Sequence, residues 1–339
     1  MLLTRRHLLS ACGVAGGALL LPSAPAAAST TVQPDDWLGW FRANRRHVAA
    51  VVDDGNGGRV AHRPHERQPL ASAVKVLHLA GYASAVDRRQ VEPGEPVTVG
   101  DWEKFYLALD GGAHQQALKA LGIKSTNGHT ADDPHAKVTL DDLAAVMIRH
   151  SDNAAADYLR RRLGDDTMRR AAIRGGWPDA PVPSFLGEWL RLVLNRRVDP
   201  ERYLADPQLQ LEVIGRFPDV PKTYDGQRPW ARGTWQGTAA GLHRLHRAMD
   251  RFPGAPAHLE QRQDLPAGVA GIGFKGGSLA GVITVGCRVR WHDGRVGTAA
   301  VLTEEVDEQR FHTAPALVGL VRQALLDPAA LREFQVSLS

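Results

Sequence analysis

Apolar residues along this 339-residue chain follow strand patterns near both ends and helical patterns in the middle. Between residues 46 and 64, two apolar runs flank Asp54-Gly55-Asn56-Gly57-Gly58, a sequence typical of a hairpin turn. Three Val-rich segments, residues 268–279, 281–296 and 297–306, are divided by Gly and Asp-Gly turns and predict further strands. Both ends of the chain therefore supply strands.

Helical periodicity dominates from about residue 76 to residue 249. Within this region, Thr139 stands three residues before Asp142 and predicts the N-terminal cap of a helix. We also expect a short helix at residues 36–46 and a last amphipathic helix at residues 315–326.

This order of elements predicts an α+β fold, with one antiparallel sheet built from both chain ends, flanking helices and an inserted all-α lobe. The α/β lobe is expected at about residues 35–75 and 236–327, and the helical lobe at about residues 76–235. Both belong to one expected domain, residues 29–339. A cleft between two lobes is the usual place for a ligand.

The composition agrees with this picture. With 43% hydrophobic and 23% charged residues, it is that of a globular protein with a sizeable core. The formal charge is only +4, and the sequence contains no stripe of Lys and Arg with interleaved aromatic residues. Nucleic-acid binding is therefore not indicated.

Residues 1–28 are typical of a cleaved export signal, because Arg5-Arg6 precede an apolar run that ends in small residues. The paired arginines are typical of the twin-arginine type. We expect an exported protein, periplasmic or extracellular, that is a monomer without stable membrane insertion after cleavage. Cys12 imitates a lipoprotein cysteine, but the apolar run before it is too short. Cleavage would leave Cys287 alone, which excludes an internal disulfide.

Ser72 and Lys75 stand three residues apart in an apolar, helix-prone segment. Residues at this spacing share one face of a helix. A buried lysine with a lowered pKa is a suitable base for a serine nucleophile. The alternative, a surface lysine on an amphipathic helix, stays open at this point.

Ser151-Asp152-Asn153 follow an apolar helical segment that ends near Ile148. The hydroxyl of Ser151 would relay a proton to a leaving group, and the amide of Asn153 would hold a substrate carbonyl. Capping of the next helix explains such a Ser/Asp/Asn cluster equally well.

Lys275-Gly276-Gly277-Ser278 lie inside a predicted strand. Glycines weaken a strand unless a backbone or a ligand must approach closely. A lysine beside them suits an edge strand that presents N–H groups and a positive charge to an anionic substrate. A β-bulge with an exposed lysine is the alternative.

Taken in this order, the S-x-x-K, S-D-N and K-[TSG]-G motifs resemble those of the serine beta-lactamases and penicillin-binding proteins, most closely class A. The resemblance covers about residues 35–327. It implies a beta-lactamase-like fold without a metal or organic cofactor. The implied partner is a small-molecule substrate, a beta-lactam or a related amide or ester, and not a nucleic acid.

The resemblance also implies the acylation chemistry. Ser72 would be the acylated nucleophile, and Lys75 would be its base or proton relay. Ser151 would pass a proton to the leaving nitrogen. The backbone N–H groups of Ser72 and Ser278 would form the oxyanion hole.

The same resemblance implies the substrate contacts. Asn153 would bind the amide side chain of the substrate. Lys275 would steady Ser151 and attract the substrate carboxylate, and Gly277 and Ser278 belong to the substrate-binding strand.

Three departures from the family pattern bear on function. Ser72 and Ser151 are 79 residues apart, more than class A predicts, and the extra segment includes residues 99–123. Gly276 replaces the usual Thr or Ser and so removes a hydroxyl for the substrate carboxylate, although Ser278 would partly compensate.

The third departure concerns deacylation. Class A enzymes use a glutamate in an E-x-x-L-N loop, whereas this chain has Glu188-Trp189-Leu190-Arg191-Leu192, without the asparagine. Glu188 is the candidate base for deacylation. Its alternative role is that of a surface carboxylate on an amphipathic helix.

Three functions fit these residues. The first is a beta-lactam hydrolase, which requires Glu188 or another base. The second is an acyl-serine hydrolase, transferase or peptidase acting on an ester, an amide or a peptidoglycan-like substrate. The third is a non-catalytic penicillin-recognition module, which the retained acylation residues disfavour.

Two histidine pairs superficially suggest a metal site. His62 and His65 are three residues apart, as are His243 and His246, but neither pair has supporting Cys or Asp residues and arginines flank both. The sequence therefore predicts solvated faces at both pairs and no metal.

Overall fold

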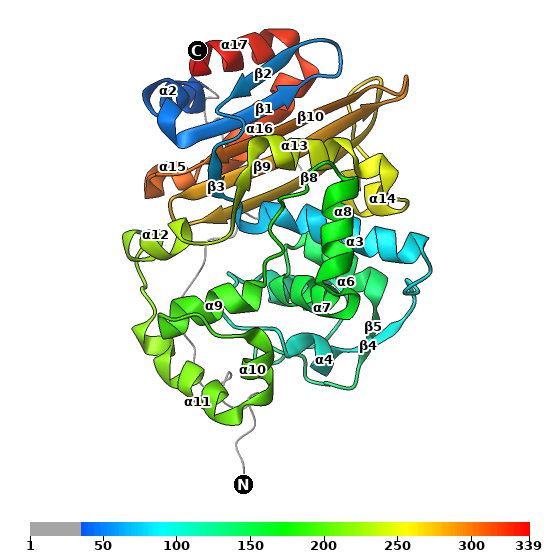
Figure 1. Cartoon of the computed structure of the whole chain (residues 1–339), viewed down its shortest axis with the longest axis vertical. Coiled ribbons are helices and arrows are strands. Elements are labelled where there is room, and N and C mark those ends of the chain that lie inside the picture. Colours follow the sequence, from blue (N-terminus) through cyan, green and yellow to red (C-terminus); the bar gives the residue numbers. More distant parts are fainter. Residues whose placement is uncertain (1–34) are drawn as a thin grey trace.

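The computed structural model describes residues 35–339. The expected export signal and Cys12 lie outside the described residues. The large sheet and the helices that cover it occupy one end of the molecule, and a group of helices occupies the other (Figure 1).

A six-stranded antiparallel sheet combines strands from both ends of the chain, in the order β2-β1-β10-β9-β8-β7. Its strands are β1 (Val48–Asp53), β2 (Arg59–His62), β7 (Glu260–Gln261), β8 (Val269–Leu279), β9 (Val282–Trp291) and β10 (Val296–Thr303). The first and last of these strands are neighbours, with Val48 opposite Thr303. The predicted fold class is therefore confirmed.

Both faces of this sheet are covered by helices. The covering helices are α2 (Asp35–Ala43), α13 (Ala239–Arg247), α16 (Ala314–Leu326) and α17 (Pro328–Leu338). Ala50 and Val52 of β1 enter the core that includes residues of α2, α16 and α17, whereas Ala49 and Val51 enter the core on the α13 side. Successive strand residues point to opposite faces, so a strand buried on both sides is apolar throughout.

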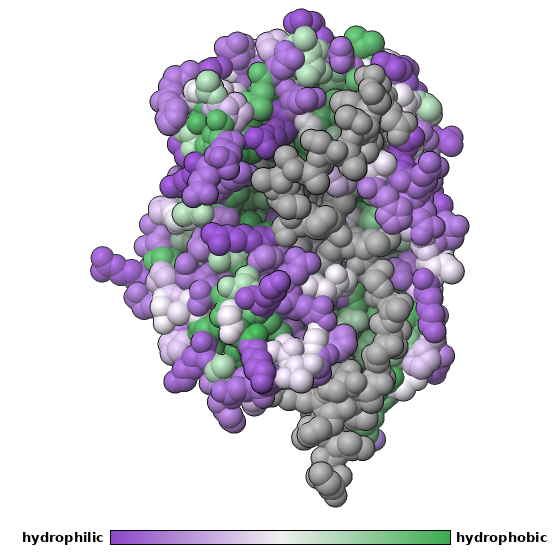
Figure 2. Space-filling model, turned by 180° about the vertical axis from the view of Figure 1, so that it is seen from behind, coloured by the Kyte–Doolittle hydropathy of each residue, from purple (hydrophilic) through white to green (hydrophobic). Residues whose placement is uncertain are grey.

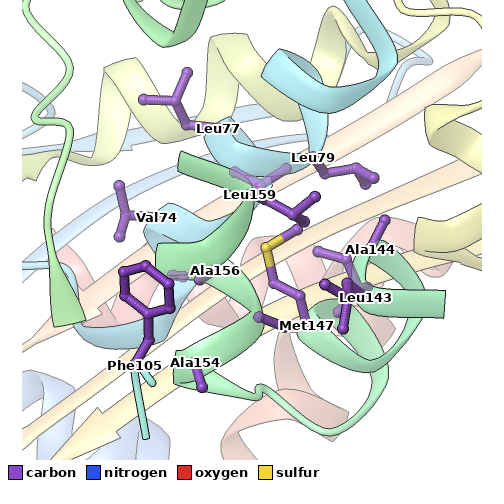
Figure 3. Close-up of a cluster of buried hydrophobic side chains, with 14 of the residues drawn as sticks. Val74, Leu77, Leu79, Phe105, Leu143, Ala144, Met147, Ala154, Ala156 and Leu159 are labelled. Carbon is purple, nitrogen blue, oxygen red and sulfur yellow. The ribbon is translucent and has the colours of Figure 1, made fainter. Parts of the chain in front are cut away.

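The remaining helices form the other end of the molecule or connect the elements of the sheet. They are α3 (Lys75–Asp87), α4 (Val99–Glu103), α5 (Ala113–Ala120), α6 (Leu140–Arg149), α7 (Asn153–Leu163), α8 (Asp165–Arg174), α9 (Phe185–Leu194), α10 (Pro200–Ala205), α11 (Pro207–Arg216), α12 (Tyr224–Arg232), α14 (Ala255–Leu259) and α15 (Glu308–Phe311). Figure 3 shows Leu79 of α3, Met147 of α6 and Leu159 of α7 in one hydrophobic cluster. Residues 75–85 of α3 are all buried, so this helix has no face for water.

The sequence predicted an all-α lobe at residues 76–235, but this region also contains two short strands, β4 (Pro96–Thr98) and β5 (Lys137–Thr139), which pair with each other. Two further short strands, β3 (Arg67–Pro69) and β6 (Gln236–Thr238), pair within the predicted α/β lobe and were not predicted either. Three residues are too few to show a strand period in the sequence. The predicted cap at Thr139 is confirmed, because its Oγ1 accepts a hydrogen bond of 3.0 Å from the Asp142 N–H.

A second C-terminal helix extends beyond the predicted last helix. After α16, the side chain of Asp327 caps α17 by accepting a hydrogen bond from the Ala329 N–H, and Pro328 takes the first helical position. The Phe334 ring of α17 meets the Phe41 ring of α2 edge-on, with centroids 5.3 Å apart. The Asp327-Pro328 pair is a typical helix start in the sequence. The prediction that ended the α/β lobe at residue 327 missed it.

The coloured part of the face in Figure 2 is mainly hydrophilic, with hydrophobic residues scattered between. Among residues 35–339, none of the helices combines the length and the apolar character needed to cross a membrane.

Phe334→Ala is expected to lower the free energy of unfolding by about 3 kcal/mol, because it removes a fully buried ring from the contact between α17 and α2. Val336→Ala is the matched control, since Val336 lies on the same helix and is 62% exposed. Urea unfolding measures both. A loss below about 1 kcal/mol for Phe334→Ala would show that α17 does not unfold with the rest of the core.

Candidate active site

Ser72 lies in a tight turn that leads directly into α3. Residues 71–74 form one turn of 3₁₀ helix, and Ala71 has a positive φ of 46°. A non-glycine residue in this left-handed region is strained, and the surrounding packing must hold it there. The turn places the Ser72 Oγ 2.9 Å from the Nζ of Lys75.

Lys75 is fully buried, and oxygen atoms surround its amine. Its Nζ lies 2.6 Å from the Ser151 carbonyl oxygen, 3.2 Å from the Ser151 Oγ and 2.5 Å from the Asn153 Oδ1. Burial, and after it the positive charge of Lys275, holds the pKa of Lys75 well below its ordinary value. A lowered pKa is the property that a base for the Ser72 hydroxyl requires.

Ser151 and Asn153 flank a carboxylate that fixes the start of α7. The Asp152 side chain accepts hydrogen bonds from the Ala155 N–H at 2.5 Å and from the Trp102 Nε1 at 3.1 Å. Ser151 has a positive φ of 61°. Helix capping is thus the task of Asp152, while Ser151 and Asn153 contact Lys75.

Lys275 approaches the same serine from β8. Its Nζ donates to the Ser151 Oγ at 3.0 Å and to the Gly276 carbonyl at 2.8 Å. The side chain is 4% exposed, and burial lowers its pKa to about 7. The alternative of an exposed lysine at a bulge is wrong, because the register of β8 shifts only between Val269 and Gly271.

β8 packs so closely against the Ser72 turn that position 277 must be glycine. A Cβ atom at Gly277 would lie 2.3 Å from the Ser72 backbone nitrogen and 2.7 Å from that of Ala73. Both distances are below any real contact, so only glycine fits. The neighbouring Ser278 lines the same cavity as Ser72.

The glycine at position 276 packs against a neighbouring side chain and not against the Ser72 turn. A Cβ atom there would lie 2.6 Å from Cζ of Phe274 and 3.1 Å from the Thr284 carbonyl oxygen. The Phe274 ring occupies the space that a side chain at position 276 would need. A side chain with the hydroxyl missing from the strand motif would therefore require the Phe274 ring to move.

The cavity at Ser72 is narrow, with a volume of about 50 Å³, and its walls are largely aromatic. Its aromatic lining comprises Phe185, Trp189, Trp230 and Trp235. The rings of Trp189 and Trp230 stack with centroids 4.9 Å apart. Such walls suit an apolar acyl group next to the polar Ser72 and Asn153.

Glu188 lies in the first turn of α9 and lines the same cavity as Ser72. Its carboxylate is 12% exposed and accepts from Arg191, with the Oε2 2.9 Å from Nε and 2.7 Å from Nη2. Its backbone carbonyl accepts from the Trp230 Nε1 at 3.1 Å. Glu188 is thus a half-buried carboxylate at the cavity, tied to a guanidinium.

Residues 99–123 supply a buried histidine that the sequence analysis missed. His114 Nδ1 lies 2.8 Å from the Asp152 Oδ2, and its Nε2 lies 3.5 Å from the Glu103 Oε1. Its ring stacks on Tyr106 with centroids 4.3 Å apart. Burial opposes a charge on His114, but the carboxylate of Asp152 prevails and raises its pKa to about 10. An imidazolium therefore holds the carboxylate that positions Ser151.

Asp110, from the same segment, was also missed. Its buried carboxylate accepts from the N–H groups of Gly112 and His114, at 3.1 and 2.9 Å, and lines the Ser72 cavity. Burial raises its pKa to about 6, although the charge of His114 opposes this. The one signal in the sequence was the unusual length of the segment between Ser72 and Ser151.

The prediction of solvated faces is wrong for His243 and His246, which are 5% and 0% exposed. Both lie on the face of α13 that packs on the sheet, where the His243 Nε2 is 2.8 Å from the Thr298 Oγ1. Flanking arginines concealed this buried face. Within residues 35–339 no group of three or more His, Cys, Asp or Glu side chains is placed to hold a metal ion.

Comparison with known sequences relates this site to one family. A model of the beta-lactamase enzyme family matches residues 40–202, which include Ser72, Lys75, Ser151 and Glu188 but not β8. A beta-lactamase of Streptomyces cellulosae is 30% identical over 183 residues, covering 49% of this chain and 50% of that protein. A beta-lactamase of Streptomyces lavendulae is 30% identical over 220 residues, 64% of this chain and 61% of that protein. The chain thus matches between half and about three fifths of the length of these relatives.

Solved structures share the fold across most of the described chain. A beta-lactamase from Sphaerobacter thermophilus superposes with a TM-score of 0.56 at 18% identity, covering 85% of this chain and 96% of that one. A variant of the reconstructed class A beta-lactamase from the last common ancestor of Gram-negative bacteria gives a TM-score of 0.51 at 19% identity, covering 86% and 97%. At such identities the likeness establishes the fold alone.

His114→Gln is expected to lower the free energy of unfolding by roughly 3 kcal/mol at pH 6, because it leaves the Asp152 carboxylate buried without its cation. The pKa of His114 is raised from 6.5 to about 10, so its stabilisation is complete below pH 6.5 and is lost as the pH rises through about 10. The difference between wild type and variant should therefore shrink between these two values.

Urea unfolding at pH 6, 8 and 10 measures this difference, with the exposed His135→Gln as the matched control. Titrating groups that do not interact with His114 are common to both proteins and cancel. A difference that stays constant with pH would show that His114 is neutral in the folded protein.

Proposed function

We propose that this chain, which matches a model of the beta-lactamase enzyme family over residues 40–202 and resembles two beta-lactamases at 30% identity, is a serine hydrolase that forms an acyl-enzyme at Ser72 and hydrolyses beta-lactam amides. The observation that carries this proposal is the buried Nζ of Lys75, 2.9 Å from the Ser72 Oγ and 3.2 Å from the Ser151 Oγ. A nucleophile, its base and a proton relay are thus in contact.

Acylation begins with Lys75 in its unprotonated form. Its two N–H groups are donated to the Ser151 carbonyl and to the Asn153 Oδ1, at 2.6 and 2.5 Å, which leaves the lone pair for the Ser72 hydroxyl. The proton of Ser72 moves to Nζ as Oγ bonds to the substrate carbonyl carbon. The C–N bond then breaks, and the leaving nitrogen takes the proton of Ser151, which Lys75 replaces.

The substrate is held from β8. The backbone N–H groups of Ser72 and Ser278 stabilise the oxyanion, for which the close approach at Gly277 is required. Lys275 in its charged form attracts a carboxylate on the leaving side of the substrate. It also orients the Ser151 hydroxyl through their 3.0 Å hydrogen bond.

Glu188 is the base that activates water for deacylation. It lines the cavity that contains Ser72, and its carboxylate is held in one orientation by Arg191. A carboxylate held at the wall of this cavity is placed to accept a proton from water.

Two features of the site favour a second candidate function. The pairing of Glu188 with Arg191 and the lack of a hydroxyl at Gly276 both depart from a site suited to rapid beta-lactam hydrolysis. The acyl group would then come from an ester, an amide or a peptidoglycan-like peptide. The chemistry at Ser72 stays the same.

The place of action follows from the sequence. The arginine pair and apolar run in residues 1–28 support export by a twin-arginine-type signal to the periplasm or the exterior. In that compartment the protein acts as a monomer without stable membrane insertion. A beta-lactam hydrolase there would confer antibiotic resistance.

Intact-mass spectrometry with a penicillin over time tests the proposed function. Wild type is expected to gain the mass of the penicillin and then lose it, and Ser72→Ala to gain nothing. Glu188→Gln is expected to keep the adduct at least about 100 times longer, because the general base is gone. Glu201→Gln is the matched control, since Glu201 is a half-exposed carboxylate paired with Arg161 on the surface.

The other outcomes select other functions. A lasting adduct on wild type would rule out the hydrolase and support acyl transfer to another acceptor. No adduct with any beta-lactam or activated ester would support a binding module. An adduct on Glu188→Gln that decays as fast as on wild type would remove Glu188 from the mechanism.

Gly277→Ala is expected to slow acylation about 100-fold or more, because the added Cβ atom pushes β8 away from the Ser72 backbone nitrogen and opens the oxyanion hole. The rate of adduct formation measures this. Gly39→Ala is the control, since a Cβ atom at Gly39 meets nothing within 4 Å. An unchanged rate in Gly277→Ala would show that the oxyanion is not stabilised between β8 and the Ser72 turn.

A further inference from the structure

A second cavity lies next to the Ser72 cavity and is much larger. Its volume is about 370 Å³, against about 50 Å³ at Ser72, and the two cavities share Glu188 and Trp235 in their walls. We call the larger cavity the arginine annex, after its charged lining of Arg160, Asp165, Arg169, Glu188, Arg191 and Arg197. The mechanism proposed above uses only Glu188 and Arg191 of these residues.

The annex has a surplus of positive charge, since four guanidinium groups face two carboxylates. Asp165 is engaged by Arg160, with oxygen–nitrogen distances of 2.8 and 2.9 Å, and Glu188 is engaged by Arg191. Both acids of the lining are thus already paired. An anion that enters the annex meets the remaining guanidinium groups.

Two of the arginines are left for such an anion. Arg169 is 61% exposed and bonds to Asp166, which is not part of the lining, and it also lies 3.7 Å from the Asp165 Oδ2, so it is only partly available. Arg197 has no hydrogen bond or ion pair with any residue in the described part of the chain. A planar guanidinium without a partner suits a carboxylate or phosphate oxygen pair.

The volumes of the two cavities indicate which part of the substrate reaches the annex. The Ser72 cavity has room for only a few water molecules, so a long acyl group bonded to Ser72 must extend beyond it. Trp235 stands between the two cavities and is 38% exposed, an apolar surface across which such a chain can lie.

We propose that the arginine annex binds a carboxylate at the far end of the substrate's acyl side chain, with an apolar segment of that chain lying across Trp235. The substrates of the site are then amides or esters whose acyl group ends in an anion. This carboxylate is distinct from the one that Lys275 attracts on the leaving side. The inference rests on the proposed function, because it places the acyl group at Ser72.

Matched cephalosporins test the inference. One series carries linear acyl chains of four to eight carbons that end in a carboxylate, and the other carries the same chains ending in a primary amide. For wild type, kcat/KM is expected to favour the carboxylate at least about threefold at the chain length that reaches the annex, as for one partly exposed ion pair. The preference should shrink in 0.5 M salt.

Arg197→Gln is expected to reduce this ratio to about one. Arg196→Gln is the matched control and should keep the ratio, because Arg196 is the adjacent residue, lies outside the annex and pairs with Glu212. A ratio near one for wild type at every chain length overturns the inference. So does a ratio that Arg197→Gln leaves unchanged.

Binding without turnover separates this inference from the proposed function. Isothermal titration of Ser72→Ala protein with both series gives the ratio of dissociation constants even if no beta-lactam is hydrolysed. The carboxylate should bind at least about threefold more tightly, and only when Arg197 is present. Binding of inorganic phosphate at Arg197 without any preference between the two series would show an anion site independent of the substrate, which also overturns the inference.

Discussion

The burial of the Lys75 amine is the constraint on which the rest of the site depends. An ammonium removed from water is costly without a counter-ion in contact, and the contacts of Lys75 are neutral oxygens of Ser72, Ser151 and Asn153. Burial and the charge of Lys275 both lower the pKa of Lys75, which reduces this cost. The same burial that makes a charged lysine unfavourable therefore makes the Lys75 amine a suitable base for the Ser72 hydroxyl.

Holding four oxygens around one amine requires rigid backbone in two separate segments, the Ser72 turn and residues 151–153. The Ser72 turn contains a strained residue, and so does the Ser151 segment, where φ is 61°. Behind that segment, the buried imidazolium of His114 binds the Asp152 carboxylate, which also caps α7. The long segment between Ser72 and Ser151 therefore has a structural task, because it supplies the positive charge that allows Asp152 to stay ionised out of water.

The motifs predicted much of this arrangement because they are local or follow strict contact requirements. Three residues of spacing on a helix place Ser72 and Lys75 together, and a glycine in a strand indicates a close approach, which Gly277 makes. Apolar, Val-rich segments divided by Gly and Asp-Gly turns predicted the long strands of the main sheet. His114 and Asp110 escaped prediction because their partners are remote in sequence, and no pattern states which buried carboxylate an imidazolium will meet.

The sequence by itself determined the fold class, the long strands near both chain ends with a mainly helical region between them, and the residues that carry the proposed acylation chemistry. It also determined that position 276 lacks a hydroxyl, but only the tertiary structure supplied the reason, the ring of Phe274 above it. Tertiary structure alone decided that Glu188 faces the Ser72 cavity and is held by Arg191, and that a larger, arginine-lined cavity adjoins it. Cavities and ion pairs depend on how elements pack against one another, and hydrophobic periodicity specifies which face is buried but not what that face meets.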